Sequence, residues 1–462
     1  MLPTPLSHAH HFLSRLSLVD GWLPIVVQLA GAAVVLGALS RQRWRTPRMA
    51  VAVLAGVLVS AGAHWYLASV GIAGDPAPVL LWWWLGVAGF ACGATALFWT
   101  AGPWLQRALS LIAIPLAVLS AALMANIWVG YFPTLHNAWL QFTVAPLPDQ
   151  VDRMRVTQMQ LAGERPDRGV VVPVTISDAA SRFAHRPEFV YLPPAWFASN
   201  PPPHLPAVMM IGAQLNLPSD WLRVGDAARI IDDFAVAHGG NAPVFVFVDA
   251  TGSFDNDTEC VNGRRGNASL HLTKDVVPYL ISNFGTSADR GRWGVVGWSM
   301  GGTCAVDLSV RRPELFSAII DIAGDVGPNS GNRQQTIARL FGGDVSAWAD
   351  FDPRTVISRH GTYSGVSALF EVPQGATAVA VNPERQDLAA DTLCGMASRY
   401  GISCTVDARP GRHDWPFATA AFAAGLPWLA GRLSTPGAEA VAPPGSVPAP
   451  VPPDPEVLRA AG

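Results

Sequence analysis

The sequence predicts a membrane-anchored α/β protein, with four transmembrane helices ahead of one domain built on a mostly parallel sheet of eight strands. Of its 462 residues 50% are hydrophobic and only 14% are charged, whereas about 25% are charged in ordinary soluble domains. From about residue 140 to 431, short β-branched runs alternate with helical patterns. We therefore divide the chain into an N-terminal segment (1–21), four transmembrane helices (22–135), a linker (136–165), the α/β domain (166–431) and a disordered tail rich in proline and alanine (432–462).

Four apolar stretches, at 22–40, 49–70, 77–100 and 108–131, are each long enough to cross a hydrocarbon core of about 30 Å. None contains Asp, Glu, Lys or Arg, which favours an anchoring bundle over a transporter. Five arginines lie in the first and third connections: Arg41, Arg43, Arg45, Arg48 and Arg107. The second connection carries only Asp75, so the positive-inside rule predicts a multi-pass cell-membrane protein with both termini and the α/β domain outside the cytoplasm.

Eight apolar runs in the domain read as strands: 169–176, 188–193, 207–212, 243–249, 293–298, 318–324, 377–382 and 404–410. Helical patterns lie between the later ones, at 219–238, 272–284, 300–311, 386–400 and 415–431. Strands joined by helical crossovers are parallel, and nearly continuous apolar strands are typical of a sheet covered on both faces.

The segment "GWSMGG" places Ser299 between a predicted strand and a predicted helix. A G-x-S-x-G sequence at such a junction forms a tight, strained turn in which bulky neighbours would clash. We therefore predict that Ser299 is a catalytic nucleophile. The alternative is a serine whose glycine neighbours serve only close strand-to-helix packing.

A serine hydroxyl needs a base to take its proton. His413, in "PGRHDW", follows the last predicted strand, and we predict that it is this base rather than an ordinary surface-loop histidine. His360 is the only other histidine after the serine, and it lies in a region without clear periodicity.

The carboxylate that orients the histidine should follow the seventh strand, where "AVNPERQD" offers Glu384 and Asp387. We favour Glu384, because Asp387 falls in the first turn of a helix, where a carboxylate also complements the helix dipole. Asp325 is a third candidate. For the oxyanion hole we predict the backbone N–H groups of Met300 and of Ala213, which follows the third strand.

"GWSMGG", "PGRHDW" and the strand order resemble the esterase D and antigen 85 branch of the α/β-hydrolases over about 165–431. The four predicted N-terminal helices, followed by "VGYFPTL", are similar to the N-terminal part of membrane-anchored actinobacterial members of this branch. The resemblance implies an α/β-hydrolase fold with a glutamate, Glu384, as the acid. Antigen 85 proteins have an aspartate that helps to bind trehalose where this chain has Ile211, which argues against trehalose mycolyl transfer and leaves acyl-ester chemistry untouched.

The segment that begins "FDNDTEC" is similar to a loop that borders the active-site mouth in the anchored members. The resemblance makes Asp255, Asn256 and Asp257 candidates for substrate contact, although we favour turn-forming roles for them.

Four of the five cysteines fall in the domain, and an even set in an oxidising compartment predicts two disulfides. Of the three possible pairings we favour Cys260 with Cys304 and Cys394 with Cys404. The sequence has no zinc-type Cys/His spacing and no phosphate or dinucleotide motif, so we predict neither a metal nor a cofactor. The net charge of −3 gives no case for nucleic acid.

The sequence thus predicts an extracytoplasmic, membrane-tethered serine esterase or acyltransferase. Its substrate would be an acyl ester of a lipid or cell-envelope glycolipid, because an enzyme for a soluble metabolite would not need a tether. The alternative is a non-catalytic hydrolase-like domain that binds envelope lipids or scaffolds a cell-wall complex.

Overall fold

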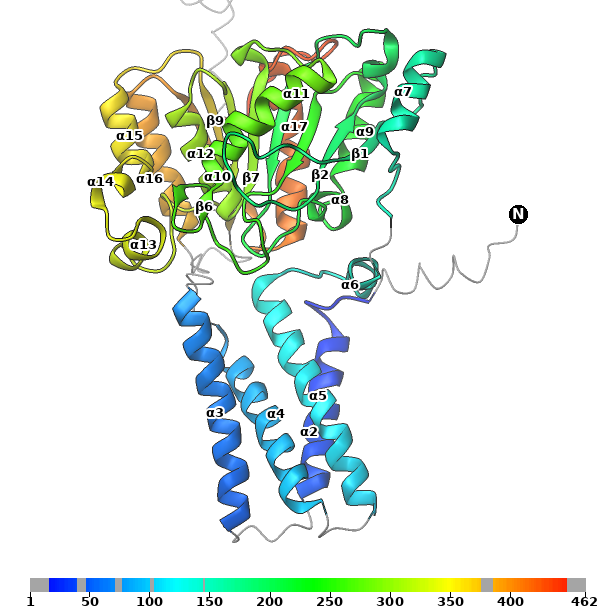
Figure 1. The fold of residues 1–462 in the computed structure, drawn as a ribbon, viewed down its shortest axis with the longest axis vertical. Coiled ribbons are helices and arrows are strands. Elements are labelled where there is room, and N and C mark those ends of the chain that lie inside the picture. Colours follow the sequence, from blue (N-terminus) through cyan, green and yellow to red (C-terminus); the bar gives the residue numbers. More distant parts are fainter. Residues whose placement is uncertain are drawn as a thin grey trace, which may run out of the picture.

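The computed structural model describes residues 16–39, 47–70, 77–99, 104–143, 146–374 and 385–446. An α/β domain lies at one end of a bundle of four long helices (Figure 1). The bundle helices are α2 (Trp22–Leu39), α3 (Pro47–Val70), α4 (Val79–Phe98) and α5 (Trp104–Val129). All four are long and apolar enough to cross a membrane.

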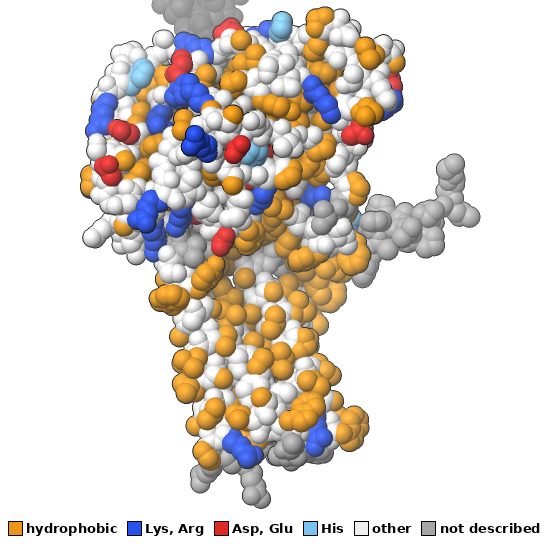
Figure 2. Space-filling model, in the orientation of Figure 1, with side chains coloured by type: hydrophobic (Ala, Val, Ile, Leu, Met, Phe, Trp, Pro, Cys, Tyr) orange, Lys and Arg blue, Asp and Glu red, His pale blue; other side chains and the backbone are white. Residues whose placement is uncertain are grey.

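The bundle turns apolar side chains outward. Leu29 and Leu58 are 64% and 63% exposed, and hydrophobic atoms cover most of the bundle's visible side (Figure 2). Helix α3 packs on α4, and α5 packs on both α2 and α4. A Cβ on Gly56 would lie 2.5 Å from the carbonyl oxygen of Gly86, so the α3–α4 crossing needs a glycine there. An apolar exterior around close small-residue contacts is typical of helices surrounded by lipid.

Two short helices follow the bundle in the segment that we treat as a linker. Helix α6 (Leu135–Phe142) begins at a Thr134 cap, and α7 (Arg153–Ala162) begins at an Asp152 cap. Each cap side chain accepts a hydrogen bond from a backbone N–H of the first turn.

The domain contains an eight-stranded sheet with the strand order β1-β2-β4-β3-β7-β8-β9-β10. Its strands are β1 (Val170–Val174), β2 (Glu188–Leu192), β3 (Ala207–Ile211), β4 (Val244–Val248), β7 (Trp293–Trp298), β8 (Ala318–Ile322), β9 (Ser367–Gln374) and β10 (Ser403–Pro410). The β1–β2 and β2–β4 pairs are antiparallel, and all other pairs in this sheet are parallel. The predicted α/β fold class is confirmed.

Helices cover both faces of the sheet. Helices α9 (Ala227–Ala237) and α17 (Trp415–Arg432) pack on one face, and α11 (Val277–Phe284), α12 (Met300–Arg311) and α16 (Gln386–Arg399) pack on the other. In β4 the phenylalanines at 245 and 247 point to the first face, and the valines at 244, 246 and 248 point to the second. Alternate residues of a strand point to opposite faces, so a strand buried on both sides is apolar throughout.

The seventh strand differs from its predicted position. The predicted strand at 377–382 lies outside the described residues, and the strand that pairs with β8 and β10 is β9 at 367–374. The apolar pattern of β9 is interrupted by Pro373 and by the buried Glu371, whose carboxylate pairs with Arg409 of β10 at 2.7 Å. Burial raises the pKa of Glu371 to about 8.

Several helices also differ from the prediction. The single helix predicted at 219–238 is two, α8 (Asp220–Arg223) and α9, because the chain turns at Asp226, which has a φ of 52°. The predicted helix at 272–284 begins as a π-helix, η2 (His271–Val276), before α11. The segment without clear periodicity holds three helices: α13 (Arg333–Phe341), α14 (Val345–Ala349) and α15 (Pro353–His360).

The first part of the predicted disordered tail packs on the domain. Leu433 and Thr435 are buried, and a Cβ on Gly431 would lie 2.2 Å from the carbonyl oxygen of Glu439. The described chain therefore continues to residue 446, and residues 447–462 lie outside the described residues.

Candidate active site

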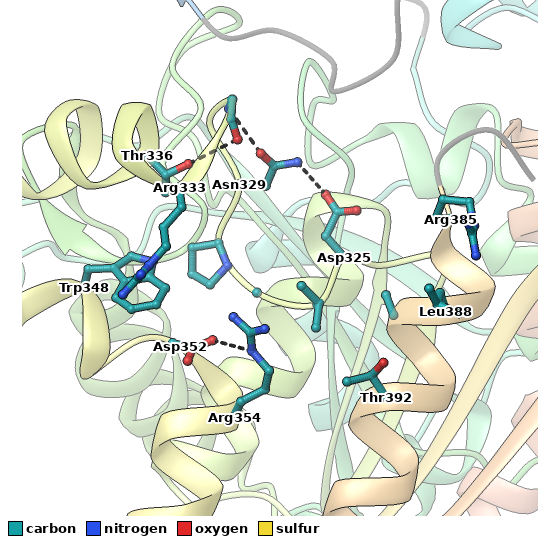
Figure 3. Close-up of a pocket in the computed structure, with 15 residues that line it drawn as sticks. Asp325, Asn329, Arg333, Thr336, Trp348, Asp352, Arg354, Arg385, Leu388 and Thr392 are labelled. Atoms are coloured by element: carbon teal, nitrogen blue, oxygen red, sulfur yellow. Dashed lines mark hydrogen bonds and ion pairs between the residues drawn. The ribbon is translucent and has the colours of Figure 1, made fainter. Parts of the chain in front are cut away.

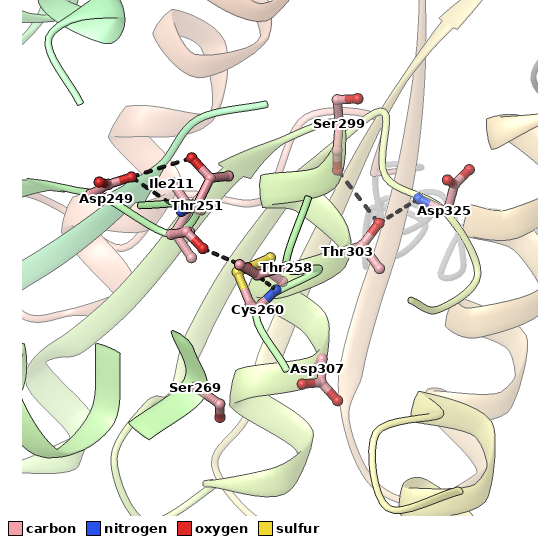
Figure 4. Close-up of a disulfide and its surroundings, with 12 residues drawn as sticks. Ile211, Asp249, Thr251, Thr258, Cys260, Ser269, Ser299, Thr303, Asp307 and Asp325 are labelled. Carbon is pink, nitrogen blue, oxygen red and sulfur yellow. Dashed lines mark hydrogen bonds between the residues drawn. A yellow bond between two sulfur atoms is a disulfide. The ribbon is translucent and has the colours of Figure 1, made fainter. Parts of the chain in front are cut away.

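Ser299 occupies a sharp turn between β7 and α12 (Figure 4). Its backbone has φ 58° and ψ −120°, a conformation that residues with a β-carbon rarely adopt. The Ser299 N–H donates to the carbonyl of Ile322 at 2.8 Å, and its own carbonyl accepts from the N–H of Gly302 at 2.8 Å. Backbone strain that the surroundings hold in place is typical of active-site residues.

The glycines around Ser299 are required by close backbone contacts. A Cβ on Gly297 would lie 1.7 Å from the carbonyl oxygen of Gly301, and a Cβ on Gly301 would lie 2.4 Å from that of Ile211. The G-x-S-x-G spacing therefore allows the first turn of α12 to pack directly on the end of β3.

His413 lies in the loop between β10 and α17. Its ring packs edge-on against Trp298, the residue before the serine, with 5.7 Å between ring centroids. The Nδ1 atom of His413 lies 2.9 Å from the side-chain nitrogen of Gln386. This face of the imidazole is therefore directed at the segment that follows β9, from which the orienting carboxylate is predicted to come.

The favoured acid, Glu384, lies outside the described residues. Gln386, two residues further on, is 2% exposed and is the first residue of α16. The alternative acid, Asp387, lies in the first turn of α16 and pairs with Arg385 at 3.7 Å. The Asp325 carboxylate accepts a hydrogen bond from Asn329 at 3.1 Å. Sequence reasoning missed Gln386. Its position after the seventh strand was the only signal, and that strand was predicted at 377–382 instead of 367–374.

The loop after β3 carries the predicted oxyanion donor Ala213. Its N–H donates to the Asn216 side-chain oxygen at 2.8 Å, so this donor is already engaged. In the same loop the Gln214 side-chain nitrogen, which the sequence did not indicate, is buried and has no hydrogen-bond partner among the described residues. The buried ion pair of Arg186 with Asp249, at 2.6 Å, holds this loop, because Arg186 also donates to the Asn216 carbonyl at 3.0 Å. Met300, the other predicted donor, is the first residue of α12.

The loop after β4 is tied to the helix of the nucleophile. A disulfide joins Cys260 to Cys304 of α12 (Figure 4), and a second joins Cys394 of α16 to Cys404 of β10. These are the two pairs that we favour from the sequence. In the same loop Asn256 donates to the carbonyls of Thr251 and Arg265, at 2.8 and 2.9 Å, which is a turn-forming role.

Two of the loop's carboxyl groups are buried beside the disulfide. Burial raises the pKa of Asp257 to about 6. Burial and the neighbouring Asp257 raise the pKa of Glu259 well above its usual range. The Asp257 carboxylate lies 3.4 Å from the Arg265 guanidinium, which favours the charged form of this carboxylate.

Replacing both Cys260 and Cys304 by alanine should destabilise the chain more than the same change at Cys394 and Cys404. The first bridge closes a loop of 44 residues and the second a loop of 10. Chain entropy then predicts a loss of unfolding free energy that is about 1 kcal/mol larger for the first pair. Thermal unfolding of the two double variants in detergent checks this, and an equal fall in unfolding temperature would contradict it.

One described group has the residue types of a metal site. His185, Glu188 and His271 offer ligand atoms within 4.8 Å of one another. Both ring nitrogens of His185 face backbone carbonyls, at 2.9 and 3.1 Å. Those of His271 face the carboxylates of Glu188 and Asp275, at 3.1 and 3.3 Å. Since every ring nitrogen already faces a hydrogen-bond acceptor, the group serves as a buried hydrogen-bond network.

The chain has similarity to several known proteins. A protein of Corynebacterium glutamicum is 28% identical over 442 residues, which are 90% of this chain and 97% of the relative. An S-formylglutathione hydrolase from Agrobacterium tumefaciens is 18% identical, with a TM-score of 0.46, and the match covers 58% of this chain and 97% of the hydrolase chain. MPT51 of Mycobacterium tuberculosis is 16% identical, with a TM-score of 0.39, and the match covers 56% of this chain and 98% of the MPT51 chain.

The esterase family model matches residues 184–429. This range runs from just before β2 almost to the end of α17, and it includes the strained serine and the histidine loop. The resemblance predicted from the sequence is thereby confirmed. The chain belongs to the esterase family and is a carboxylic ester hydrolase with an α/β-hydrolase fold.

Proposed function

We propose that the chain is a membrane-anchored serine esterase or acyltransferase that acts on an acyl ester of a lipid or cell-envelope glycolipid at the extracytoplasmic membrane face. The observation that carries the proposal is that the carboxyl ends of the parallel strands face the bundle. Tyr131 donates to Asp220, in the segment after β3. Arg339, after β8, donates to the carbonyl of Ala68 in α3 at 2.6 Å. Ligands of α/β proteins bind at this edge of the sheet.

The histidine loop lies at the same junction. Arg412 pairs with Asp20, just before α2. A Cβ on Gly130, just after α5, would lie 2.7 Å from the Asp414 Cβ and 3.1 Å from the His413 carbonyl oxygen. The loop that presents His413 therefore packs on the end of a predicted transmembrane helix. An ester in the adjacent leaflet would lie close to Ser299, which favours a lipid substrate over a soluble one.

The charges of the bundle support an extracytoplasmic domain. Ala68 and Gly130, near the ends of α3 and α5, contact the domain, so Arg48 and Arg107, near the starts of these helices, lie at the opposite end. Arginine side chains, drawn in blue, are visible at that end in Figure 2. Arginine-rich connections favour the cytoplasmic side, and the two disulfides favour an oxidising compartment for the domain.

In the proposed reaction, His413 takes the proton of the Ser299 hydroxyl as Oγ attacks the ester carbonyl carbon. The N–H groups of Met300 and Ala213 stabilise the oxyanion, which requires Ala213 to exchange its bond with Asn216. His413 then protonates the leaving alcohol as its C–O bond breaks, and water or a sugar hydroxyl resolves the acyl-enzyme. Glu384, or alternatively Asp387, orients the imidazole.

The mass of the Ser299 peptide after incubation of the full chain with envelope lipids tests the proposal. We expect the peptide to gain the mass of one acyl group, and the Ser299→Ala variant to gain none. The released product distinguishes the two reactions, because hydrolysis gives a free fatty acid and transfer gives an acylated sugar. A folded wild-type chain that forms no adduct with any lipid ester would refute the proposal.

A further inference from the structure

A cavity of about 420 Å³ lies beyond the carboxyl ends of β8 and β9 (Figure 3). Its walls come from the loop after β8, which carries Asp325 and Asn329, from the first turns of α13 and α15, from α14, and from the first two turns of α16. Helices α13, α14 and α15 belong to the part of the domain in which the sequence showed no clear periodicity.

The cavity adjoins the nucleophile. The Thr303 hydroxyl, one turn into α12, accepts a hydrogen bond from the Asp325 N–H at 2.8 Å. The same hydroxyl lies 3.5 Å from the Ser299 carbonyl oxygen (Figure 4). A single side chain, that of Thr303, therefore links the backbone of Asp325 in the cavity wall to the backbone of the serine.

The cavity is lined by more positive than negative groups. Its three guanidinium groups belong to Arg333, Arg354 and Arg385, and its two carboxylates belong to Asp325 and Asp352. Arg354 pairs with Asp352 at 3.1 Å, and Arg385 pairs with Asp387 at 3.7 Å. Arg333 has no carboxylate within ion-pair distance in the described part of the chain. It instead lies over the Trp348 ring, 4.3 Å from its centroid. Stacking fixes the plane of the guanidinium and leaves its N–H donors available to an anion.

The wall that carries Arg333 also contacts the bundle. Arg333 is the first residue of α13, and Arg339 of the same helix donates to the carbonyl of Ala68 in α3. The positive group therefore lies on a nine-residue helix fixed to the membrane end of the domain. Lipid phosphates are concentrated at this depth, in the headgroup layer just outside the hydrocarbon core.

We propose that this cavity binds the phosphate of the substrate's headgroup, and that Arg333 is the main contact. The inference rests on the proposed function, because it names the lipid class whose ester Ser299 attacks. A phosphate accepts two parallel N–H bonds from a guanidinium, which a neutral sugar or glycerol headgroup cannot do with the same strength.

Binding to the catalytically inactive full chain tests the proposal without requiring turnover. The Ser299→Ala chain in detergent is added to a fluorescent short-chain phosphatidylglycerol, and binding is measured by the fluorescence anisotropy of this probe. Adding Arg333→Gln should weaken binding about tenfold or more, since one charge-assisted contact is lost. Arg333→Lys keeps the positive charge but loses the two parallel N–H donors of the guanidinium. Its affinity for the probe should lie between that of the Ser299→Ala chain and that of the chain with Arg333→Gln added. Arg399→Gln, on α16 but outside the cavity, should change nothing.

Competition identifies the source of the phosphate. Displacement of the probe by unlabelled phosphatidylglycerol but not by a diacylglycerol of equal chain length supports a lipid headgroup site. Equal displacement by inorganic phosphate supports the same site with free phosphate as its ligand. Equal displacement by diacylglycerol, or undiminished binding in Arg333→Gln, would overturn the inference. A Ser299 adduct formed from neutral lipids in the mass experiment, together with such a result, would leave the proposed function standing.

Discussion

Replacement of Ser299 by alanine should lower esterase turnover by about 10³-fold or more, because the reaction then has no nucleophile and retains only the binding and oxyanion contributions. The hydroxyl is a small group at the start of α12, and its removal leaves the backbone contacts of the turn in place. Hydrolysis of a p-nitrophenyl ester by the detergent-solubilised full chain measures the loss.

Ser309→Ala is the matched control for this experiment. Ser309 lies on the same helix and is buried, and its hydroxyl has no hydrogen-bond partner in the described part of the chain. Its replacement should leave turnover within about twofold of wild type, in line with the small effects of changes away from functional groups. A Ser299→Ala chain that keeps a tenth of wild-type turnover would be incompatible with the proposed reaction.

Gly297→Ala should destabilise the domain by more than about 4 kcal/mol, which is the range of severe core overlaps. The added Cβ would lie 1.7 Å from the backbone oxygen of Gly301, and backbone atoms cannot move aside as a flexible side chain can. Relief of the overlap would require α12 to shift relative to β7. We expect the variant to lose its cooperative thermal transition.

Gly395→Ala provides the control, because a Cβ there would meet nothing within 4 Å. It lies inside α16, where alanine is favoured over glycine by about 1 kcal/mol. This variant should be as stable as wild type or slightly more so. A Gly297→Ala chain that unfolds at the wild-type temperature would mean that the turn at Ser299 is looser than described.

The parts of the fold that sequence reasoning predicted best are those with continuous patterns. The run "PVFVFVD" became β4, buried on both faces, and the glycines of "GWSMGG" became the turn around Ser299. In both cases one local pattern, apolar continuity or glycine spacing, is sufficient to specify the structure. The cysteine pairs also follow from few alternatives.

The missed elements lack such patterns. Strand β9 contains a buried glutamate whose partner, Arg409, is 38 residues away, so its strand character depends on a distant contact. The helices between 333 and 360 are short and depend on caps: Asn332 and Gln335 form a capping box, and Asp352 caps the helix that begins with Pro353. These cap signals were present in the sequence and could have indicated the two helices.

The site could be predicted only in part for a similar reason. Gln386 and Gln214 belong to no motif, and only the fold brings the one to His413 and buries the other in the loop after β3. Likewise, no pattern in the sequence indicates that the carboxyl ends of the parallel strands face the bundle. That orientation depends on single contacts between distant segments, such as Arg339 with Ala68.

Labelling of intact cells with a membrane-impermeant fluorophosphonate tests the central claim most directly. Our account predicts that the probe forms a covalent adduct on Ser299 without cell lysis, and that Ser299→Ala abolishes it. Labelling of Ser299 only after lysis would contradict the extracytoplasmic placement, and a folded chain that the probe never labels would contradict the serine mechanism.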